Sequence, residues 1–239
     1  MLIYAHRGYS SLYPENTLTS FKAAIATGAD GIETDIHVTR DGILVITHDE
    51  EISRVSDGKG MVRDLTYEEL LKFDFGSWKD EQFRGERIPT LDELLDLLEG
   101  TNMVLNIEIK MGFVMYPDIE EKALAKVTER GFLDRVIFSS FNHYSIAKIK
   151  KLNPHAKVAP LYAEGIFEPF NYAKTFDAYA IHPSKAVICG PIVEDCHKMD
   201  LKVNVWTVND GELAKSFQKM GVDGIITDRP LELIKMLRS

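Results

Sequence analysis

The sequence contains no apolar run approaching the roughly 20 residues that a membrane-spanning helix requires, which excludes an integral membrane protein. Its first residues lack a basic segment, a long apolar segment and a small-residue cleavage site, so we expect no export and a cytoplasmic location. Cys189 and Cys196 are the only cysteines, too few for a disulfide framework. They lie in a segment with a helical pattern, and we expect both to be small buried side chains.

Positive charge is also scarce. The chain has 28 Lys and Arg against 37 Asp and Glu, a formal net charge of −9, which argues against a general nucleic-acid binder. A small phosphate ester stays compatible with this charge if local cations or a metal offset it. No internal repeat, low-complexity tract or linker divides the chain, so we expect one domain over residues 1–239. The oligomeric state has no signature in the sequence.

Short β-rich runs alternate with amphipathic helical runs from one end of the chain to the other. The expected strands cover 2–5, 30–38, 103–109, 136–141, 157–161, 178–182, 202–207 and 224–227. The expected helices cover 18–27, 90–98, 118–130, 144–152, 167–174, 191–199, 210–220 and 231–237. Thr90 begins a capping box, and glycines follow several helices as C-terminal caps prefer. Eight strands and eight helices in strict alternation predict an α/β fold of the TIM (β/α)8 barrel type.

One connection breaks this rhythm, because forty residues separate His48 from Pro89. Loops between a strand and a helix usually have about 2 to 6 residues, and longer ones commonly serve a function. This segment has a helix signal of its own at 66–71. We therefore predict a small insertion subdomain at about 50–89, after the second strand and over the barrel mouth, where active sites of this fold lie.

Acidic side chains alternate with apolar ones on two of the expected strands. Because side chains in a strand alternate between faces, Glu33 and Asp35 share one face, and Glu108 and Lys110 share a face of the next strand. Helices cover the outside of a barrel, so the acidic face points inward. Three carboxylates in one place repel one another unless a cation compensates them. We predict one divalent cation, Mg²⁺ or Ca²⁺, held by Glu33, Asp35 and Glu108; the alternative is an ion-pair network without metal.

Two histidines lie where strands should end next to these carboxylates. His6 follows the first strand and His48 follows the second, so both can flank the metal and act as base and acid in one reaction. Which of them gives the proton and which takes it stays open. We expect His37 and His155 to be surface or packing residues, whereas His182 could line the mouth.

An anionic substrate would need cations, and Arg7 and Lys110 lie beside the predicted metal ligands. Arg binds phosphate oxygens in a bidentate manner, whereas Lys acts as a point charge. Trp206 and Phe141 come at the ends of two later strands, where an aromatic ring can pack on an apolar or polyol part of a substrate. We predict these four residues as substrate-binding.

Taken together, the motifs resemble the glycerophosphodiester phosphodiesterase family. The matching motifs are His6-Arg7-Gly8, Pro14-Glu15-Asn16-Thr17, Glu33-x-Asp35, His48-Asp49, Glu108-x-Lys110, Trp206-Thr207-Val208-Asn209 and the segment from Gly221 to Pro230. The resemblance runs almost from end to end and includes the insertion. It implies metal-dependent cleavage of glycerophosphodiesters to sn-glycerol 3-phosphate and an alcohol such as choline or ethanolamine. It also implies metal ligands at Glu33, Asp35 and Glu108, acid/base catalysis by His6 and His48, and phosphate contacts from Arg7 and Lys110.

Two other functions fit parts of this pattern. One is a lipid phosphodiesterase similar to phospholipase D or sphingomyelinase D, but such proteins are typically secreted and carry disulfides. The other is a non-catalytic module that binds phosphate esters, against which the complete acid/base pair speaks. Action on a small-molecule diester, without a nucleic-acid or integral-membrane partner, is the function that the sequence predicts.

Overall fold

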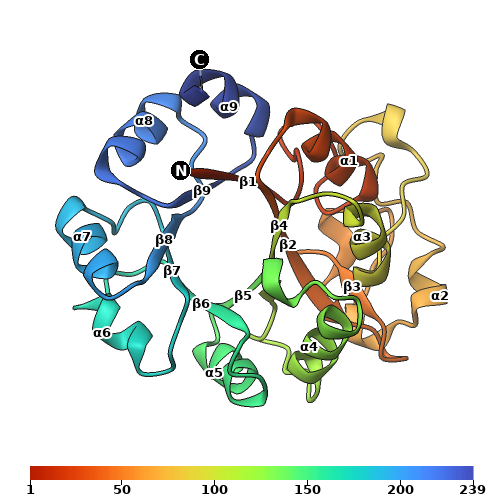
Figure 1. Cartoon of the computed structure of the whole chain (residues 1–239). Coiled ribbons are helices and arrows are strands. Elements are labelled where there is room, and N and C mark those ends of the chain that lie inside the picture. The colour runs from red at the N-terminus through yellow and green to blue at the C-terminus, as the bar shows by residue number, and fades with distance from the viewer. Residues whose placement is uncertain (239) are drawn as a thin grey trace.

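The computed structural model describes residues 1–238, and within them eight parallel strands form a closed ring surrounded by helices (Figure 1). The strands of the ring are β1 (Leu2–His6), β2 (Gly31–Val38), β4 (Val104–Ile109), β5 (Val136–Ser140), β6 (Lys157–Tyr162), β7 (Ala180–Pro183), β8 (Lys202–Val205) and β9 (Gly224–Thr227). The ring closes because β1 pairs in parallel with both β2 and β9. The predicted TIM barrel is therefore confirmed, with every strand of the ring close to its predicted position.

Helices connect the strands and pack around the ring. They are α1 (Leu18–Thr27), α3 (Leu91–Leu98), α4 (Ile119–Glu129), α5 (His143–Leu152), α6 (Pro169–Lys174), α7 (Gly190–Lys198), α8 (Gly211–Met220) and α9 (Pro230–Arg238). Local sequence sets several of their ends. Thr90 and Glu93 form the predicted capping box at the start of α3, and Gly28 ends α1 in the left-handed region at φ 77°.

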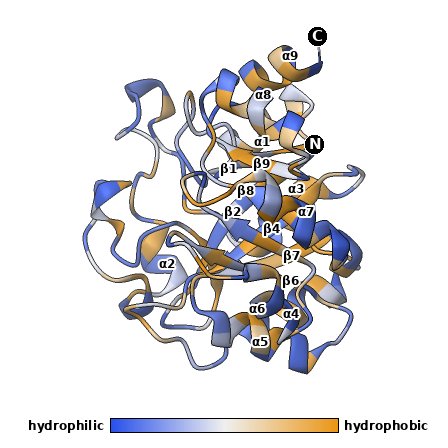
Figure 2. Ribbon diagram, turned by 90° about the vertical axis from the view of Figure 1, so that its left-hand side faces the viewer, coloured by the Kyte–Doolittle hydropathy of each residue, from blue (hydrophilic) through white to orange (hydrophobic). Residues whose placement is uncertain are grey.

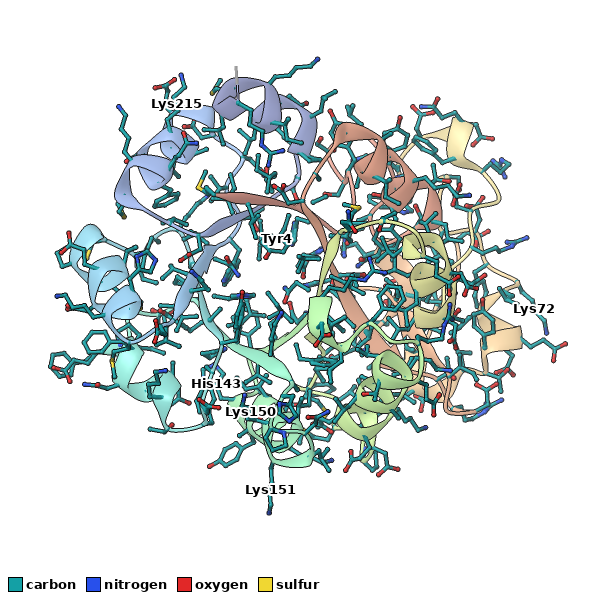
Figure 3. The ribbon with its side chains drawn as sticks, in the orientation of Figure 1. Tyr4, Lys72, His143, Lys150, Lys151 and Lys215 are labelled. Atoms are coloured by element: carbon teal, nitrogen blue, oxygen red, sulfur yellow. The ribbon has the colours of Figure 1, made fainter. Side chains whose placement is uncertain are left out.

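The apolar core lies between the ring and the helices. Ile32 and Ile36 of β2 and Leu105 and Ile107 of β4 point outward into this layer and are fully buried. The alternate residues of the same strands point into the ring, which agrees with the predicted assignment of faces. Figure 3 shows Tyr4 of β1 near the centre of the ring, whereas the labelled lysines lie at the periphery.

A strand that was not predicted from the sequence precedes the insertion. β3 (Leu44–Ile46) follows β2 after a turn, pairs antiparallel with it and lies outside the ring. Its short apolar run did not stand out as a strand in the sequence. Three 3₁₀ turns and the short helix α2 (Tyr67–Leu70) follow. Their buried residues form a separate apolar cluster with Val45 and Ile88. Figure 2 shows α2 at the end of the barrel opposite the N-terminus, where β1 and β2 end.

Among the helices of residues 1–238, none is long and apolar enough to cross a membrane. Cys196 is buried in α7 as predicted, but Cys189 is exposed at the residue before that helix, so the prediction was wrong for this cysteine. Its place at the helix start explains the difference, because the buried stripe of α7 begins only at Val193.

The interior of the ring contains a buried histidine that does not reach the mouth. His182 of β7 is 1% exposed, and its Nε2 accepts a hydrogen bond from the Asn204 amide at 3.0 Å. Burial lowers the pKa of His182 to about 3. The expectation that His182 could line the mouth is not met, because this buried side chain is not among the residues that line the cavities there.

This histidine makes stability depend on pH. The unfolded chain binds a proton at His182 near pH 6.5 and the folded chain only near pH 3, so stability is complete above pH 6.5 and falls as the pH drops toward 3. At pH 5 the loss is about 2 kcal/mol relative to pH 7. Denaturant unfolding at both pH values should show a smaller loss for His182→Gln than for the unchanged chain. The exposed His155→Gln serves as the control, and equal losses for all three proteins would contradict the prediction.

Candidate active site

Three buried carboxylates meet where β2 and β4 end. In the register of these parallel strands Asp35 is opposite Glu108. Glu33 lies two residues before Asp35 on β2, opposite Asn106. One oxygen from each of Glu33, Asp35 and Glu108 lies within 4.8 Å of the others. The structure thus brings together the three residues predicted as metal ligands, and all three are less than 9% exposed.

Crowding changes the acidity of these carboxylates. Burial, reinforced by the charges of its neighbours Asp35 and Glu108, raises the pKa of Glu33 well above its usual range. Burial also raises the pKa of Glu108 to about 7, although Lys110 opposes the shift. Burial would raise the pKa of Asp35 as well, but Lys110 and Arg7 hold it well below its usual range. Without a further cation, the cluster therefore retains protons near neutrality.

The donor set fits a hard divalent cation. All three ligating groups are carboxylates, which suit Mg²⁺ or Ca²⁺ better than Zn²⁺. Asp35 Oδ1 is buried and accepts no hydrogen bond within residues 1–238. A buried oxygen without a donor is costly unless a partner binds there. Glu33, Asp35 and Glu108 together could therefore hold one divalent cation.

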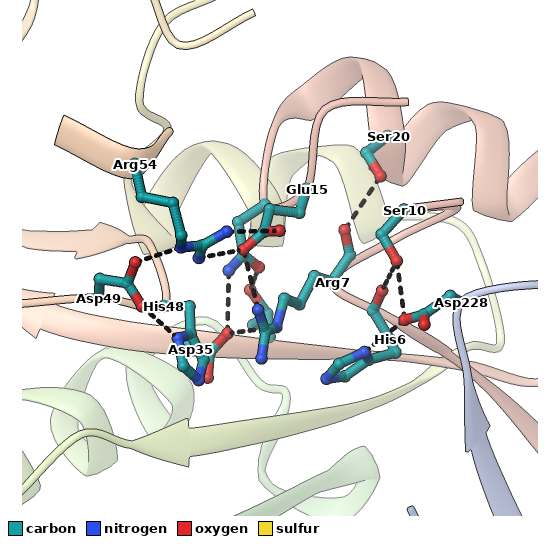
Figure 4. Close-up of polar contacts among 12 residues, drawn as sticks. His6, Arg7, Ser10, Glu15, Ser20, Asp35, His48, Asp49, Arg54 and Asp228 are labelled. Atoms are coloured by element: carbon teal, nitrogen blue, oxygen red, sulfur yellow. Dashed lines mark hydrogen bonds and ion pairs between the residues drawn. The ribbon is translucent and has the colours of Figure 1, made fainter. Parts of the chain in front are cut away.

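Each of the two predicted catalytic histidines pairs with an aspartate through its Nδ1 atom (Figure 4). His6 Nδ1 lies 2.6 Å from Asp228 Oδ1, and His48 Nδ1 lies 2.6 Å from Asp49 Oδ1. A carboxylate on Nδ1 fixes the ring and leaves Nε2 directed elsewhere. His6 Nε2 points toward the triad, 3.9 Å from Glu33 Oε2. Burial, together with the positive charges of Arg7 and Lys110, lowers the pKa of His48, although Asp35 and Asp49 act in the opposite direction.

The predicted cations lie between the carboxylates. Arg7 Nη1 donates to Glu15 Oε1 at 2.9 Å, and its Nε lies 3.4 Å from Asp35 Oδ2. Lys110 Nζ lies 2.8 Å from Glu108 Oε1 and 3.5 Å from Asp35 Oδ1. Burial would lower the pKa of Lys110, but these carboxylates outweigh it and raise the pKa. Both side chains therefore stay charged beside the triad.

Backbone geometry places Arg7. Its φ is 54°, and its N–H donates to the Glu33 carbonyl at 2.8 Å, which brings the end of β1 over the triad. Gly8 follows at φ 84°, and a Cβ there would lie 2.2 Å from Ser20 Oγ of α1. Glycine is required at this turn because both the conformation and the space exclude a side chain.

The two predicted aromatic residues stand across the mouth from the carboxylates. Phe141 and Trp206 follow β5 and β8 and pack edge to face with their ring centroids 5.5 Å apart. Trp206 Nε1 donates to the His182 carbonyl at 2.8 Å. Both rings line a small pocket of about 90 Å³ that also contains His6, His48 and Glu108. The structure thus gathers all nine predicted site residues around one mouth.

Other polar residues of the site were not assigned from the sequence. Arg54 of the insertion pairs with both Asp49 and Glu15, so it connects the partner of His48 to the partner of Arg7 (Figure 4). Asp228 is also held by Asn209, whose amide donates to Oδ2 at 2.5 Å. Four of these residues lie in the motifs named in the sequence analysis: Glu15, Asp49, Asn209 and Asp228. Their polar side chains within those motifs could have identified them as site residues. Arg54 lies in an irregular turn without any such signal.

His37 differs from its expected place at the surface. It shares the inward face of β2 with Asp35, because residues two apart in a strand point the same way. It is fully buried, and its ring nitrogens lie 2.9 Å from the Tyr116 hydroxyl and 3.1 Å from the His48 carbonyl. His37 therefore packs under the loop that carries His48. Of the two places predicted for it, surface or packing, the structure confirms packing.

The chain matches the model of the glycerophosphoryl diester phosphodiesterase family over residues 6–232. It is 48% identical to a glycerophosphodiester phosphodiesterase of Caldanaerobacter subterraneus subsp. tengcongensis, over 99% of this chain and 98% of that one. A glycerophosphodiester phosphodiesterase of Bacillus altitudinis is 39% identical, over 98% and 97% of the two chains.

A solved structure extends this similarity to three dimensions. The structure of an Oleispira antarctica phosphodiesterase in complex with the product sn-glycerol-3-phosphate superposes with a TM-score of 0.90 at 30% identity. The alignment covers 100% of this chain and 97% of that one. The chain therefore belongs to the glycerophosphoryl diester phosphodiesterase family and is an enzyme of phosphodiester hydrolysis.

Proposed function

We propose that this enzyme hydrolyses glycerophosphodiesters to sn-glycerol 3-phosphate and an alcohol, with one divalent cation, Mg²⁺ or Ca²⁺, held by Glu33, Asp35 and Glu108. The observation that carries the proposal is a buried three-carboxylate cluster with a His–Asp pair on either side. A relative's structure with bound sn-glycerol-3-phosphate supports the product. We propose further that the whole chain acts as one catalytic domain, with residues of about 50–89 as an insertion.

Charge neutralisation is the first requirement of the reaction, because a phosphodiester gains negative charge in its transition state. The cation, when bound, supplies Lewis acidity and neutralises phosphoryl oxygens. Arg7 offers a guanidinium fork and Lys110 a point charge next to the same cluster. We assign both to the phosphate, and we assign Trp206 and Phe141 to packing on the carbon skeleton of the substrate.

Proton transfer is the second requirement. One group must take a proton from the nucleophile, which is either water or the glycerol 2-hydroxyl, and another must give one to the departing alkoxide. His6 and His48 present their Nε2 atoms to the same space because Asp228 and Asp49 occupy the Nδ1 atoms. The two rings therefore form the acid/base pair in this proposal.

The test is an assay of purified protein on glycerophosphocholine and glycerophosphoethanolamine with Mg²⁺ or Ca²⁺, with glycerol 3-phosphate release coupled to its dehydrogenase. We expect release that EDTA abolishes and added cation restores. Turnover of intact sphingomyelin instead of these diesters would favour a lipid phosphodiesterase. Binding of the diesters without release would favour a phosphate-ester binding module, and both results would contradict the proposal.

A further inference from the structure

A cavity of about 590 Å³ opens beside the triad on the side of His48. Its floor contains His48, Glu108 and Lys110 of the candidate active site. One side comes from residues 49–51, Arg54 and Met61, and the other from the loop that follows β4 at residues 111–113. The cavity is larger than the small pocket between Trp206 and Phe141 and continuous with the same catalytic residues, so one arm of a bound diester can extend into it.

The cavity carries excess negative charge. Four carboxylates line it, from Asp49, Glu50, Glu51 and Glu108, against the cations Arg54 and Lys110. Both cations are already engaged, because Arg54 pairs with Asp49 and Lys110 with Glu108. The remaining two carboxylates are therefore without a cationic partner among the residues that line this cavity.

Glu50 is the carboxylate of these two that is available to a ligand. Both oxygens of Glu51 are used locally, since they accept from Gly60 N–H and from Ser53. Glu50 accepts one hydrogen bond, from Val114 N–H to Oε1 at 3.0 Å, and within residues 1–238 no hydrogen bond or ion pair to its Oε2 is present. This oxygen can receive a cationic group without losing an existing contact.

Apolar side chains cover the rest of the cavity wall. Met61, Met111 and Ile109 line it together with the rings of Phe113 and Phe141. Phe113 is 86% exposed and Phe141 is 50% exposed, so part of each ring is accessible to a ligand. Aromatic faces attract ammonium groups, and proteins use this attraction to recognise quaternary ammonium ligands. A carboxylate beside accessible aromatic rings is a combination that binds organic cations.

The other spaces at the mouth suit a polyol better than a cation. The hollow on the side of His6, about 420 Å³, contains Arg7, Lys79 and Arg229 with two serines and Asn209. Its two carboxylates already have partners, since Glu15 pairs with Arg7 and Asp228 with His6. The small central pocket has Asn106 on its wall, whose amide is buried and makes no hydrogen bond with residues 1–238. Hydroxyl groups of a glycerol arm can satisfy such polar partners. The acidic and aromatic cavity beside His48 can then receive the alcohol head group of the diester.

We propose that the cavity between the insertion and the loop after β4 binds the alcohol half of the diester and selects alcohols that carry an ammonium group, with Glu50 and Phe113 as the specificity-determining residues. The proposal rests on the proposed function of the same site. It adds to that function a preference, for cationic over neutral head groups, and the residues that set it.

The experiment compares two substrates of equal shape. Glycerophosphocholine is cationic in its head group, and the diester in which 3,3-dimethylbutanol replaces choline is its neutral isostere. We expect kcat/KM to favour the choline diester about tenfold, and Glu50→Gln to reduce this ratio to about two. Glu50→Gln keeps an oxygen that can accept from Val114 N–H, so the loop stays in place. Phe113→Ala, at an exposed position, should also lower the ratio.

Glu194→Gln is the matched control, since it removes one exposed carboxylate on α7, in the outer layer of the barrel. It should leave the ratio unchanged. Equal kcat/KM for the two diesters in the unchanged enzyme, or a tenfold ratio that survives Glu50→Gln, would overturn the inference while hydrolysis itself still supports the proposed function. Failure to cleave either diester in the presence of Mg²⁺ or Ca²⁺ would instead remove the proposed function and the inference with it.

Discussion

Replacing either His6 or His48 with alanine is expected to lower kcat by at least about a hundredfold, because each ring would transfer one of the two protons in the reaction. Both rings are partly exposed at the mouth and bonded to an aspartate, so their removal opens space without disturbing the apolar core. Steady-state kinetics on glycerophosphocholine at saturating cation measure the loss. Thermal unfolding of the same preparations shows whether the variants are folded.

His197→Ala provides a matched control for this pair. His197 also pairs with an aspartate, with Nε2 2.8 Å from Asp223 Oδ2, but it lies at the end of α7 away from the mouth. We expect its kcat to stay close to that of the unchanged enzyme. Near-normal turnover by His6→Ala or His48→Ala would remove that histidine from the proposed chemistry.

The second large effect concerns the cation. Glu33→Gln removes the charge of one predicted metal ligand. We therefore expect the affinity for Mg²⁺ or Ca²⁺ to fall at least about tenfold. Stability without metal should be unchanged or higher, because Gln resembles the protonated carboxyl that the raised pKa of Glu33 favours and is never repelled by Asp35 and Glu108. Calorimetric titration measures the affinity, and thermal unfolding with and without cation measures the stabilisation that binding adds.

Glu120→Gln separates loss of a ligand from loss of any buried carboxylate. Glu120 is 2% exposed on α4 and pairs with Lys148 at 3.1 Å, outside the triad. This variant should be less stable yet bind the cation with unchanged affinity. Unchanged cation binding by Glu33→Gln would contradict its assignment as a ligand.

Sequence periodicity was sufficient to predict the triad. Glu33, Asp35 and Glu108 each lie on a strand whose alternate residues are apolar, and a parallel sheet aligns the ends of neighbouring strands. Capping signals such as Thr90 and Gly28 similarly placed helix ends to within one or two residues. These features are local, because they depend on spacings of two to four residues.

Contacts between distant segments could not be predicted in this way. Asp228 lies 222 residues from His6 in the sequence, and their pairing exists only because β9 closes the ring against β1. Arg54 lies in a 3₁₀ turn of the insertion, where no periodicity indicates the direction of a side chain. The sequence therefore predicts the site residues on regular strands, whereas the residues that pair with them can be identified only from the folded structure.

The closure of the ring between β1 and β9 also has a consequence for protein synthesis. A ribosome that has completed β4 has already made both histidines and all three carboxylates, yet the partner of His6 is still unmade. β1 has one open edge until β9 leaves the exit tunnel and pairs with it. A nascent or C-terminally truncated chain therefore carries the acidic residues of the site without the complete His6–Asp228 pair, and the finished enzyme forms only after the last βα unit has been translated.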